Sequence, residues 1–187
     1  MNNPSHNTLY PISFRPMQPK MDAAMLQKWL NHPHAKYWGM LDASQDEITA
    51  AYQKLLAIPD YQVYIGAIHN EPTFLMEFYN PKTDAVGAHY EVQQGDGGMH
   101  ILVKAPTQPI SGFTWHIFSN VMEFLFYQKG VQRIVVEPDV ANEKIHRLNK
   151  RAGFEYSKII ELEQKKAYLA FCTVQQYEAA QAPFMPI

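Results

Sequence analysis

The pattern of apolar and polar positions divides the chain into runs with two different periods. Runs in which apolar residues alternate with polar ones, or follow one another without a break, predict strands when Gly, Pro or Asn bounds them. Runs with apolar residues three and four positions apart predict amphipathic helices. The expected strands are 12–15, 61–69, 72–79, 87–92, 99–103, 133–137, 154–162 and 166–173. The expected helices are 22–30, 45–58, 112–129 and one between Asn142 and Gly153.

Two connections in this pattern have recognisable local signals. Ser44 followed three positions later by Glu47 has the form of a capping box at a helix start. Asn70 and Glu71 are expected to form the tight turn of a strand hairpin. The segment 32–40 gathers two histidines and two aromatic residues, and it is expected to be a loop.

The strand within 97–106 combines a buried pattern with polar chemistry. Gly-Gly precedes it and Pro ends it, which predicts a short buried strand. Because side chains alternate along a strand, His100, Leu102 and Lys104 face one way and the apolar residues between them face the other. A polar loop then leads to a helix that begins at Gly112. The first-turn amides of such a helix have no partner within it, so this geometry suits an anion.

The order of elements predicts an α/β (α+β) fold with a mixed sheet. The strands before 99–103 form an antiparallel meander, whereas the strand, helix, strand order that follows predicts a parallel crossover to 133–137. A hairpin closes the sheet. We expect a single domain at 12–178, with a flexible lead-in at 1–11 and an accessory tail at 179–187.

Composition limits the function classes. The 187 residues are 47% hydrophobic and 18% charged, which is typical of one globular domain. Sixteen basic and eighteen acidic residues give a formal charge of −2, so nothing favours nucleic acid or an anionic membrane as a partner. The single cysteine, Cys172, excludes an internal disulfide and favours a reducing compartment, so the cytoplasm is expected. No apolar run approaches the roughly 18 residues of a membrane span, and no export signal is expected.

His100 and Asp139 are the candidate acid–base pair. Each alone has an ordinary interpretation, His100 as a hydrogen-bonded core residue and Asp139 as a turn or cap residue. Neighbouring parallel strands would carry both into one crevice, and a histidine with a carboxylate partner is suited to proton removal near neutral pH. Their separation is not determined by the sequence.

Other polar residues have a functional and an ordinary interpretation. Lys104 and the helix start at 112–114 could cradle a pyrophosphate, although neither a Walker sequence nor G-x-G-x-x-G is present. His32 and His34 could be metal ligands, but without a Cys or carboxylate at ligand spacing we favour packing, with Trp38 as a pocket wall. Glu77, inside an apolar strand, either faces the surface or binds an amine.

Six motifs together resemble a known family. The chain is similar to the Gcn5-related N-acetyltransferase (GNAT) fold and, within it, to acyl-CoA transferases of hydroxamate siderophore biosynthesis. It most resembles the desferrioxamine-type enzymes that acylate an N-hydroxylated diamine, which are related to aerobactin-type N6-hydroxylysine acetyltransferases. The motifs are HPHAKYW at 32–38, FLME at 74–77, GDGGMHILV at 95–103, VVEPDVAN at 135–142, AGF at 152–154 and KKAYLAFC at 165–172.

The resemblance implies a parallel pair of strands splayed to bind acyl-CoA, in a mostly antiparallel sheet with helices on both faces. It implies that His100 and Asp139 act on the N-hydroxy amine, with His100 as the preferred base and a backbone N–H of Leu102 or Val103 stabilising the oxyanion. The expected acyl-CoA-binding residues are Leu102, Val103, Lys104, Gly112, Phe113, Thr114, Asn142 and Asn149. The expected substrate-binding residues are His34, Trp38 and Glu77, and no metal is expected.

Two departures from the wider fold stand out. The glycine-rich Q/R-x-x-G-x-G/A phosphate loop is replaced by TQPISG at 107–112. Asn149 stands where many members carry a tyrosine acid on the helix before AGF. This departure favours His100 and Asp139 as the acid–base residues.

The expected function is transfer of a succinyl or acetyl group from CoA to N-hydroxyputrescine or N-hydroxycadaverine in siderophore biosynthesis, with a siderophore synthetase as a partner in the pathway. Three alternatives stay open: an N6-hydroxylysine acetyltransferase, an acyltransferase of ordinary amines, and a non-catalytic acyl-CoA-binding module. A pocket Arg or Lys that pairs with a substrate carboxylate would favour hydroxylysine. The oligomeric state is not determined by the sequence.

Overall fold

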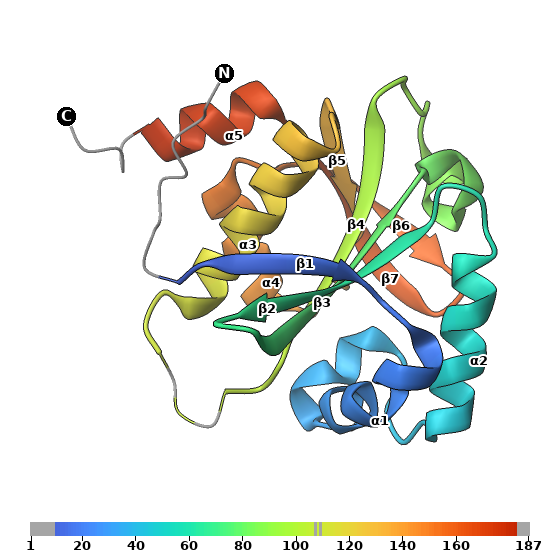
Figure 1. The fold of residues 1–187 in the computed structure, drawn as a ribbon. Helices are drawn as coiled ribbons and strands as arrows, with labels where there is room; N and C mark the ends of the chain where they lie inside the picture. Colours follow the sequence, from blue (N-terminus) through green and yellow to red (C-terminus); the bar gives the residue numbers. More distant parts are fainter. Residues whose placement is uncertain (1–9, 107, 109, 183–187) are drawn as a thin grey trace.

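A computed structural model describes residues 10–182 except 107 and 109, so most of the expected lead-in and part of the expected tail lie outside the described residues. The described chain forms a seven-stranded sheet in the order β1-β2-β3-β4-β5-β7-β6, with helices on both faces (Figure 1). The elements are β1 (Ile12–Pro16), α1 (Pro19–Leu30), η1 (Pro33–Trp38), α2 (Gln45–Leu56), β2 (Gln62–Ile68), β3 (Glu71–Tyr79), η2 (Pro81–Thr83), η3 (Ala85–His89), β4 (Asp96–Val103), α3 (Phe113–Glu123), η4 (Phe124–Gln128), β5 (Arg133–Val136), α4 (Glu143–Ala152), β6 (Glu155–Leu162), β7 (Lys165–Thr173) and α5 (Val174–Gln181).

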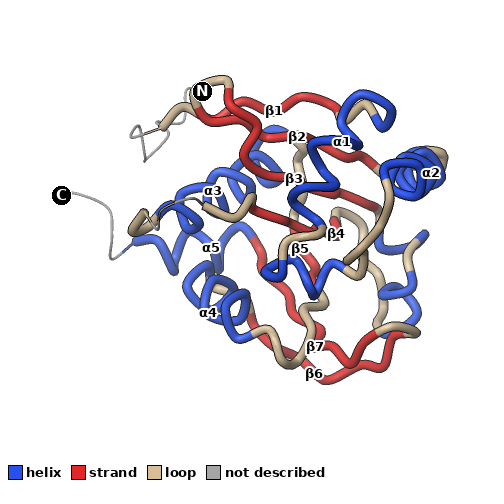
Figure 2. Tube along the Cα trace, turned by 90° about the horizontal axis from the view of Figure 1, so that it is seen from below, coloured by secondary structure: helices blue, strands red, loops and turns tan. Residues whose placement is uncertain are grey.

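The sheet separates two apolar cores. We call the face of the sheet that α1 and α2 cover the front face. The sheet side chains that point to it include Leu75, Leu102 and Val135. The opposite face, which we call the rear face, is covered by α3, α4 and α5. The sheet side chains that point to it include Met76 and Met99. Figure 2 shows the two helix layers on opposite sides of the strands. The expected alternation in β4 is therefore confirmed, and it places His100 on the front face with Leu102.

Local capping explains where several helices begin and end. The capping box at Ser44 and Glu47 is present at the start of α2, as expected. Helix α1 begins three residues before the expected Asp22, because Pro19 suits the first turn and the Asp22 carboxylate accepts the Gln18 N–H at 2.8 Å. Gly153 ends α4 with φ +92°, which glycine adopts without strain.

The parallel pair β4 and β5 separates after three residue pairs. Asp96, Gly97 and Gly98 pair with residues 133–135, and the pairing stops there. The chain that follows β5 stays beside β7, because the Tyr168 N–H donates to the Pro138 carbonyl. β4 continues to Val103 with β3 as its partner, so the other edge of β4 is free of strand pairing from Met99 onward. The predicted splayed pair is confirmed.

Three expectations about elements are corrected. The strand expected at 87–92 is not formed: η3 occupies 85–89, and Asp84 caps it by accepting the Val86 N–H at 2.9 Å. The loop expected at 32–40 contains the 3₁₀-helix η1, which Pro33 and the His32 side chain initiate. The hairpin turn lies one residue earlier than expected, at His69 and Asn70, both with positive φ.

The C-terminal helix was not expected. α5 runs through the expected domain boundary at 178, and Tyr177 buries its ring in the rear core. The Tyr177 hydroxyl donates to the Ser119 carbonyl on α3 at 3.3 Å. The first described residues of the expected tail are therefore part of a packed helix. The helix expected at 112–129 is present as α3, with its last turn, η4, in π-helical form.

Candidate active site

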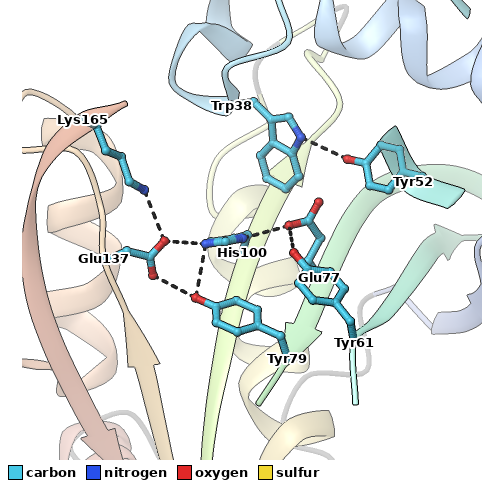
Figure 3. Close-up of polar contacts among 8 residues, drawn as sticks. All are labelled: Trp38, Tyr52, Tyr61, Glu77, Tyr79, His100, Glu137 and Lys165. Atoms are coloured by element: carbon cyan, nitrogen blue, oxygen red, sulfur yellow. Dashed lines mark hydrogen bonds and ion pairs between the residues drawn. The ribbon is translucent and has the colours of Figure 1, made fainter. Parts of the chain in front are cut away.

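His100 is clamped between two carboxylates on the front face (Figure 3). Its Nδ1 lies 2.8 Å from Glu77 Oε2, and its Nε2 lies 2.5 Å from Glu137 Oε1. Glu77 is directly opposite His100 in the β3–β4 ladder, whereas Glu137 follows the last residue of β5. The His100 side chain is 30% exposed, whereas the two carboxylates that it contacts are 7% and 4% exposed.

The Glu137 carboxylate accepts hydrogen bonds from two side chains besides His100. Its Oε1 also meets Lys165 Nζ at 3.2 Å, and its Oε2 accepts the Tyr79 hydroxyl at 3.0 Å. Lys165 reaches the site from the start of β7, as Figure 3 shows. Two cations and a hydroxyl therefore compensate one carboxylate that is only 4% exposed.

Glu77 is equally enclosed. Its Oε2 accepts the Tyr61 hydroxyl at 2.7 Å in addition to its contact with His100, and the residue is 5% exposed. The sequence offered a surface position or an amine-binding group for Glu77. The surface position is wrong, because Glu77 is buried and its carboxylate contacts and orients the His100 ring. Amine binding by Glu77 stays a prediction.

These contacts perturb the protonation of the pair strongly. Burial by itself lowers the pKa of His100, but the Glu137 and Glu77 carboxylates outweigh it and raise that pKa to about 10. Burial by itself raises the pKa of Glu137, but His100, Lys165 and Tyr79 lower it to about 2. At neutral pH, His100 is therefore an imidazolium paired with an ionised Glu137.

Asp139 does not meet His100 in the described structure. Its Oδ1 accepts the Ala141 N–H at 2.8 Å and closes the turn after β5, which is the ordinary interpretation weighed for this residue. The carboxylate that reaches His100 is Glu137, two residues earlier. Sequence reasoning missed it, although Glu137 continues the alternation of β5 on the parity of Val135 and so on the His100 face. A catalytic role for Asp139 stays a prediction.

Beyond Gly98 and Val135, β4 and β5 diverge and leave a gap between them. The edge of β4 that faces this gap presents backbone groups to it. Lys104 N–H donates to Thr73 O on β3, and backbone groups point to alternate edges along a strand. The N–H of Leu102 therefore points to β3, whereas those of Ile101 and Val103 point to the gap. Of the two N–H groups considered for an oxyanion, only that of Val103 lies on the open side.

The residues expected at the pyrophosphate site separate into two groups. Lys104 forms an ion pair with Glu71 at 2.7 Å on the front face. The α3 start lies on the rear face, where Gly112 has φ +76° and Phe113 N–H donates to Ile110 O. The next helical bond is His116 N–H to Gly112 O, so the amides of residues 114 and 115 have no backbone acceptor among the residues that the structure describes. Residues 107 and 109 of the loop lie outside the described residues.

The 3₁₀-helix η1 touches both sides of the gap. His34 Nε2 lies 2.7 Å from the Val103 carbonyl oxygen on β4. The Tyr37 hydroxyl donates to the Ala141 carbonyl, beyond β5, at 2.9 Å. Trp38 Nε1 donates to the Tyr52 hydroxyl at 3.1 Å, and its ring lies 6.2 Å from the His100 ring (Figure 3). His34 and Trp38 are thus placed at the gap and the cluster, respectively.

Two negative findings apply to the described residues. None of the helices in 10–182 is both long and apolar enough to cross a bilayer. No group of three or more His, Cys, Asp or Glu side chains in that part of the chain could hold a metal ion. His32 and His34 contact each other through their Nδ1 atoms at 2.8 Å instead.

The curated proteins that this chain resembles include two acetyltransferases of N-hydroxylated amines. The chain is 26% identical over 157 residues to the N(6)-hydroxylysine O-acetyltransferase of Escherichia coli, which covers 83% of this chain. It is 22% identical over 173 residues to the N-hydroxyputrescine acetyltransferase of Acinetobacter baumannii, which covers 92% of this chain. The match spans 50% of the first relative's length and 81% of the second's, so the chain corresponds to about half of the Escherichia coli protein.

Comparison with solved structures gives the same architecture. An uncharacterized protein from Bacillus halodurans has a TM-score of 0.87 at 26% identity and covers 96% of this chain and 92% of its own. The aminoglycoside acetyltransferase AAC(6′)-Ib, in a complex with ribostamycin and coenzyme A, has a TM-score of 0.77 at 25% identity and covers 89% of this chain and 96% of its own.

A family described as the acetyltransferase (GNAT) domain matches residues 18–162, which include β4, β5, His100 and both of its glutamate partners. With the splayed strands and the structural neighbours, this match shows that the chain belongs to the GNAT acetyltransferase family.

Proposed function

We propose that this protein transfers an acyl group from acyl-CoA to the hydroxylamine nitrogen of an N-hydroxylated diamine, N-hydroxyputrescine or N-hydroxycadaverine, and forms a hydroxamate for siderophore biosynthesis. The observation that carries the proposal is His100, clamped by two carboxylates and partly exposed beside the free edge of β4. The Acinetobacter baumannii relative, named as an N-hydroxyputrescine acetyltransferase, supports the acceptor. The acyl group is succinyl or acetyl, and a siderophore synthetase would use the product.

The residues of the gap suit an acyl-CoA molecule. The free N–H groups of Ile101 and Val103 offer donors to an amide-containing arm and to a thioester carbonyl. The open amides at the start of α3 offer donors to a pyrophosphate, helped by the helix dipole. The thioester supplies an activated acyl carbonyl with a thiol leaving group. The described structure therefore fits the group that the family implies.

The protonation state of His100 favours a hydroxylamine over an ordinary amine. An alkylamine is an ammonium at neutral pH, so it needs an extra deprotonation before attack, for which only the small fraction of neutral His100 could serve. A hydroxylamine nitrogen is less basic and is already neutral. Its lone pair forms the N–C bond while neutral His100, the minor form at this pH, takes the nitrogen proton. The C–S bond then breaks, and the departing thiolate takes that proton back from the imidazolium.

A second acceptor, N6-hydroxylysine, is favoured by one observation. Lys165 Nζ lies beside the His100 cluster and is 26% exposed, so it could pair with the carboxylate of an amino-acid substrate. It is already paired with Glu137 at 3.2 Å, which is why the diamine, lacking that carboxylate, is preferred. The Escherichia coli relative, named for hydroxylysine, is consistent with this second candidate.

The test is release of free thiol from acetyl-CoA and succinyl-CoA with each acceptor, together with mass detection of the hydroxamate. The acceptors are N-hydroxyputrescine, N-hydroxycadaverine, N6-hydroxylysine and their unhydroxylated forms. We expect the highest kcat/KM for an N-hydroxy diamine. A higher value for hydroxylysine, reduced by Lys165→Met, would select the second candidate. Coenzyme A binding without transfer to any acceptor would instead indicate a non-catalytic module.

A further inference from the structure

Both ring nitrogens of His100 are occupied by carboxylates. Nδ1 lies 2.8 Å from Glu77 Oε2, and Nε2 lies 2.5 Å from Glu137 Oε1 (Figure 3). An ionised carboxylate can only accept a hydrogen bond, so each nitrogen carries a hydrogen and the ring is an imidazolium. Neither nitrogen can take a proton from a substrate until one of the two contacts opens.

The two contacts differ in what lies between the residues. Glu77 is the direct partner of His100 in the β3–β4 ladder, so their backbones are held together. Glu137 lies across the gap: the last paired residues of β4 and β5 are Gly98 and Val135, and His100 and Glu137 each follow two positions later. Their side chains meet on one face of the sheet where the backbones have separated. A group that enters the gap would therefore displace the Nε2 contact and leave the Nδ1 contact in place.

Glu137 keeps other partners when its contact with His100 opens. Lys165 Nζ lies 3.2 Å from Oε1, and the Tyr79 hydroxyl donates to Oε2 at 3.0 Å. Lys165 comes from β7, on the other side of β5 from β4, so it approaches Glu137 from the side opposite His100 (Figure 3). A buried carboxylate that loses its only cation is costly, but Glu137 retains one here. The pair can therefore separate without leaving either side chain unpaired, because Glu77 still holds the imidazole.

We propose that an acyl thioester entering the gap separates His100 Nε2 from Glu137, and that Lys165 and Tyr79 are positioning residues that retain Glu137 when this happens. The proposal rests on the proposed function, because it takes acyl-CoA as the ligand of the gap. Separation removes the largest stabilisation of the imidazolium, so the Nε2 proton passes to water at the exposed part of the ring. Nε2 then accepts the nitrogen proton of the hydroxylamine as the N–C bond forms. The C–S bond breaks, and the departing thiolate takes that proton from Nε2.

The other titratable groups around the ring do not interfere with a titration of His100. They are Tyr52 on α2, Tyr61 before β2, Glu77 and Tyr79 on β3, Glu137 after β5 and Lys165 on β7. Burial is the largest cause that raises the pKa of each of the three phenols above its ordinary value. A further carboxylate, Asp84, adds to this rise for Tyr61 and Tyr79. These phenols therefore stay protonated over the range in which His100 is followed.

The experiment follows the ring of His100 by NMR in the full chain with ¹³C-labelled histidine. The His100 signal is the one that is missing from His100→Gln. We expect a titration midpoint of about 10 for the protein alone. With acetyl-CoA and no acceptor, the midpoint should fall by about 1–3 pH units, which is the effect of losing a neighbouring opposite charge. Adenosine 3′,5′-bisphosphate has no thioester arm, so it is the control ligand and should leave the midpoint unchanged.

Lys165→Met and Lys166→Met form a matched pair. Lys166 is the next residue and pairs with the exposed Glu161 at 3.1 Å, so its loss should leave the fall in midpoint as in the wild type. In Lys165→Met, Glu137 has His100 as its only cation among the described residues, so the contact should stay closed. We expect acetyl-CoA to lower the midpoint of this variant by less than about 0.5 unit. Glu137→Gln lacks the charged contact, so its midpoints with and without acetyl-CoA should agree.

Two results would overturn the inference. One is an equal midpoint with and without acetyl-CoA in a wild-type protein that binds it, which would mean that the contact stays closed; this comparison needs no variant. The other is a fall in Lys165→Met equal to that in Lys166→Met, which would mean that Lys165 does not retain Glu137. A wild-type protein that does not bind acetyl-CoA, or that binds it and forms no hydroxamate, would contradict the proposed function instead. The two failures are therefore distinguishable.

Discussion

His100 Nε2 and Glu137 Oε1 lie 2.5 Å apart across the two strands at the point where β4 and β5 have ceased to pair. The contact therefore bridges a gap that the backbone leaves open. It joins the partly exposed His100 ring to a carboxylate that Lys165 and Tyr79 also contact.

Loss of His100 should remove most of the acyl transfer. We expect His100→Ala to lower kcat by on the order of 10²- to 10⁴-fold, the range for loss of a general acid–base group. Thiol release under saturating substrates measures this. Calorimetry with coenzyme A is the control, because its affinity should stay within a few-fold of the wild type. Full turnover in a folded His100→Ala protein would exclude the proposed base.

The pH profile should identify which carboxylate sets the pKa of His100. If neutral His100 takes the proton, kcat/KM rises with pH toward the pKa of about 10. Glu137→Gln removes the largest stabilisation of the imidazolium, so this limb should move to lower pH. Asp139→Asn is the matched control and should leave the limb in place, because Asp139 contacts the turn rather than the ring. A shift of the limb in Asp139→Asn, with none in Glu137→Gln, would instead support His100 and Asp139 as the acid–base pair.

The same pairing makes folding stability depend on pH. The pKa of His100 is raised from its ordinary 6.5 to about 10, so its stabilisation is complete below pH 6.5 and is lost as pH rises through 10. Urea unfolding at pH 6.5 and at pH 10 should show a lower free energy of unfolding at the higher pH. A His100→Gln variant should lose this part of the dependence. An identical decline in both proteins would assign it to other groups.

The hydrogen bonds of η1 to the two sides of the gap should slow hydrogen exchange in η1 in the ligand-free protein. His34→Ala removes the contact with the Val103 carbonyl, and Tyr37→Phe removes the bond to the Ala141 carbonyl. Each loss costs about 1 kcal/mol, which is roughly a five-fold decrease in protection of residues 33–38 from hydrogen exchange. Lys36→Ala is a control, because its ammonium contacts the neighbouring Tyr37 ring and not the gap. Unchanged protection in both variants would show that η1 is held by packing alone.

The first residue of β4 should depend on its buried ion pair. Arg133 donates to both carboxylate oxygens of Asp96 at 2.8 and 2.7 Å, and the Asp96 side chain is 1% exposed. Arg133→Ala removes the cationic partner of that carboxylate and leaves it only the bonds from the Tyr90 O–H and the Gln93 N–H, so we expect a loss of about 3–5 kcal/mol in the free energy of unfolding. Urea denaturation measures it. Arg147→Ala, in a pair that is largely exposed, should change stability by less than about 0.5 kcal/mol.

Much of the fold could be predicted because the signals for it are local. The capping box at Ser44, the glycine stop at Gly153 and the alternation around His100 depend on residues within a few positions of each other. The same signals were ambiguous where a short apolar run could adopt two structures. At 87–92 the pattern favoured a strand, but the Asp84 cap and the preceding turn direct the chain into η3.

The partners of His100 illustrate what local patterns leave open. Glu77 reaches the ring because β3 and β4 pair in one register of several that the sequence allows, and a shift by one residue would turn it to the rear face. Glu137 reaches it because it follows the end of β5, two residues beyond the last β4–β5 pair, where the strands have already diverged. The pattern near Pro138 made Asp139 as plausible a partner, since sequence separation says nothing of distances across a gap.

By itself, the sequence determined most of the strands and helices, the position of His100 on the same face as Leu102 and the family resemblance, because periodicity, caps and motifs are properties of neighbouring residues. Only the tertiary structure decided that two buried glutamates clamp the imidazole, that η1 touches both sides of the gap, and that Lys165 reaches Glu137 from the side opposite His100. These relationships join residues that are far apart along the chain, and strand register and helix packing set them.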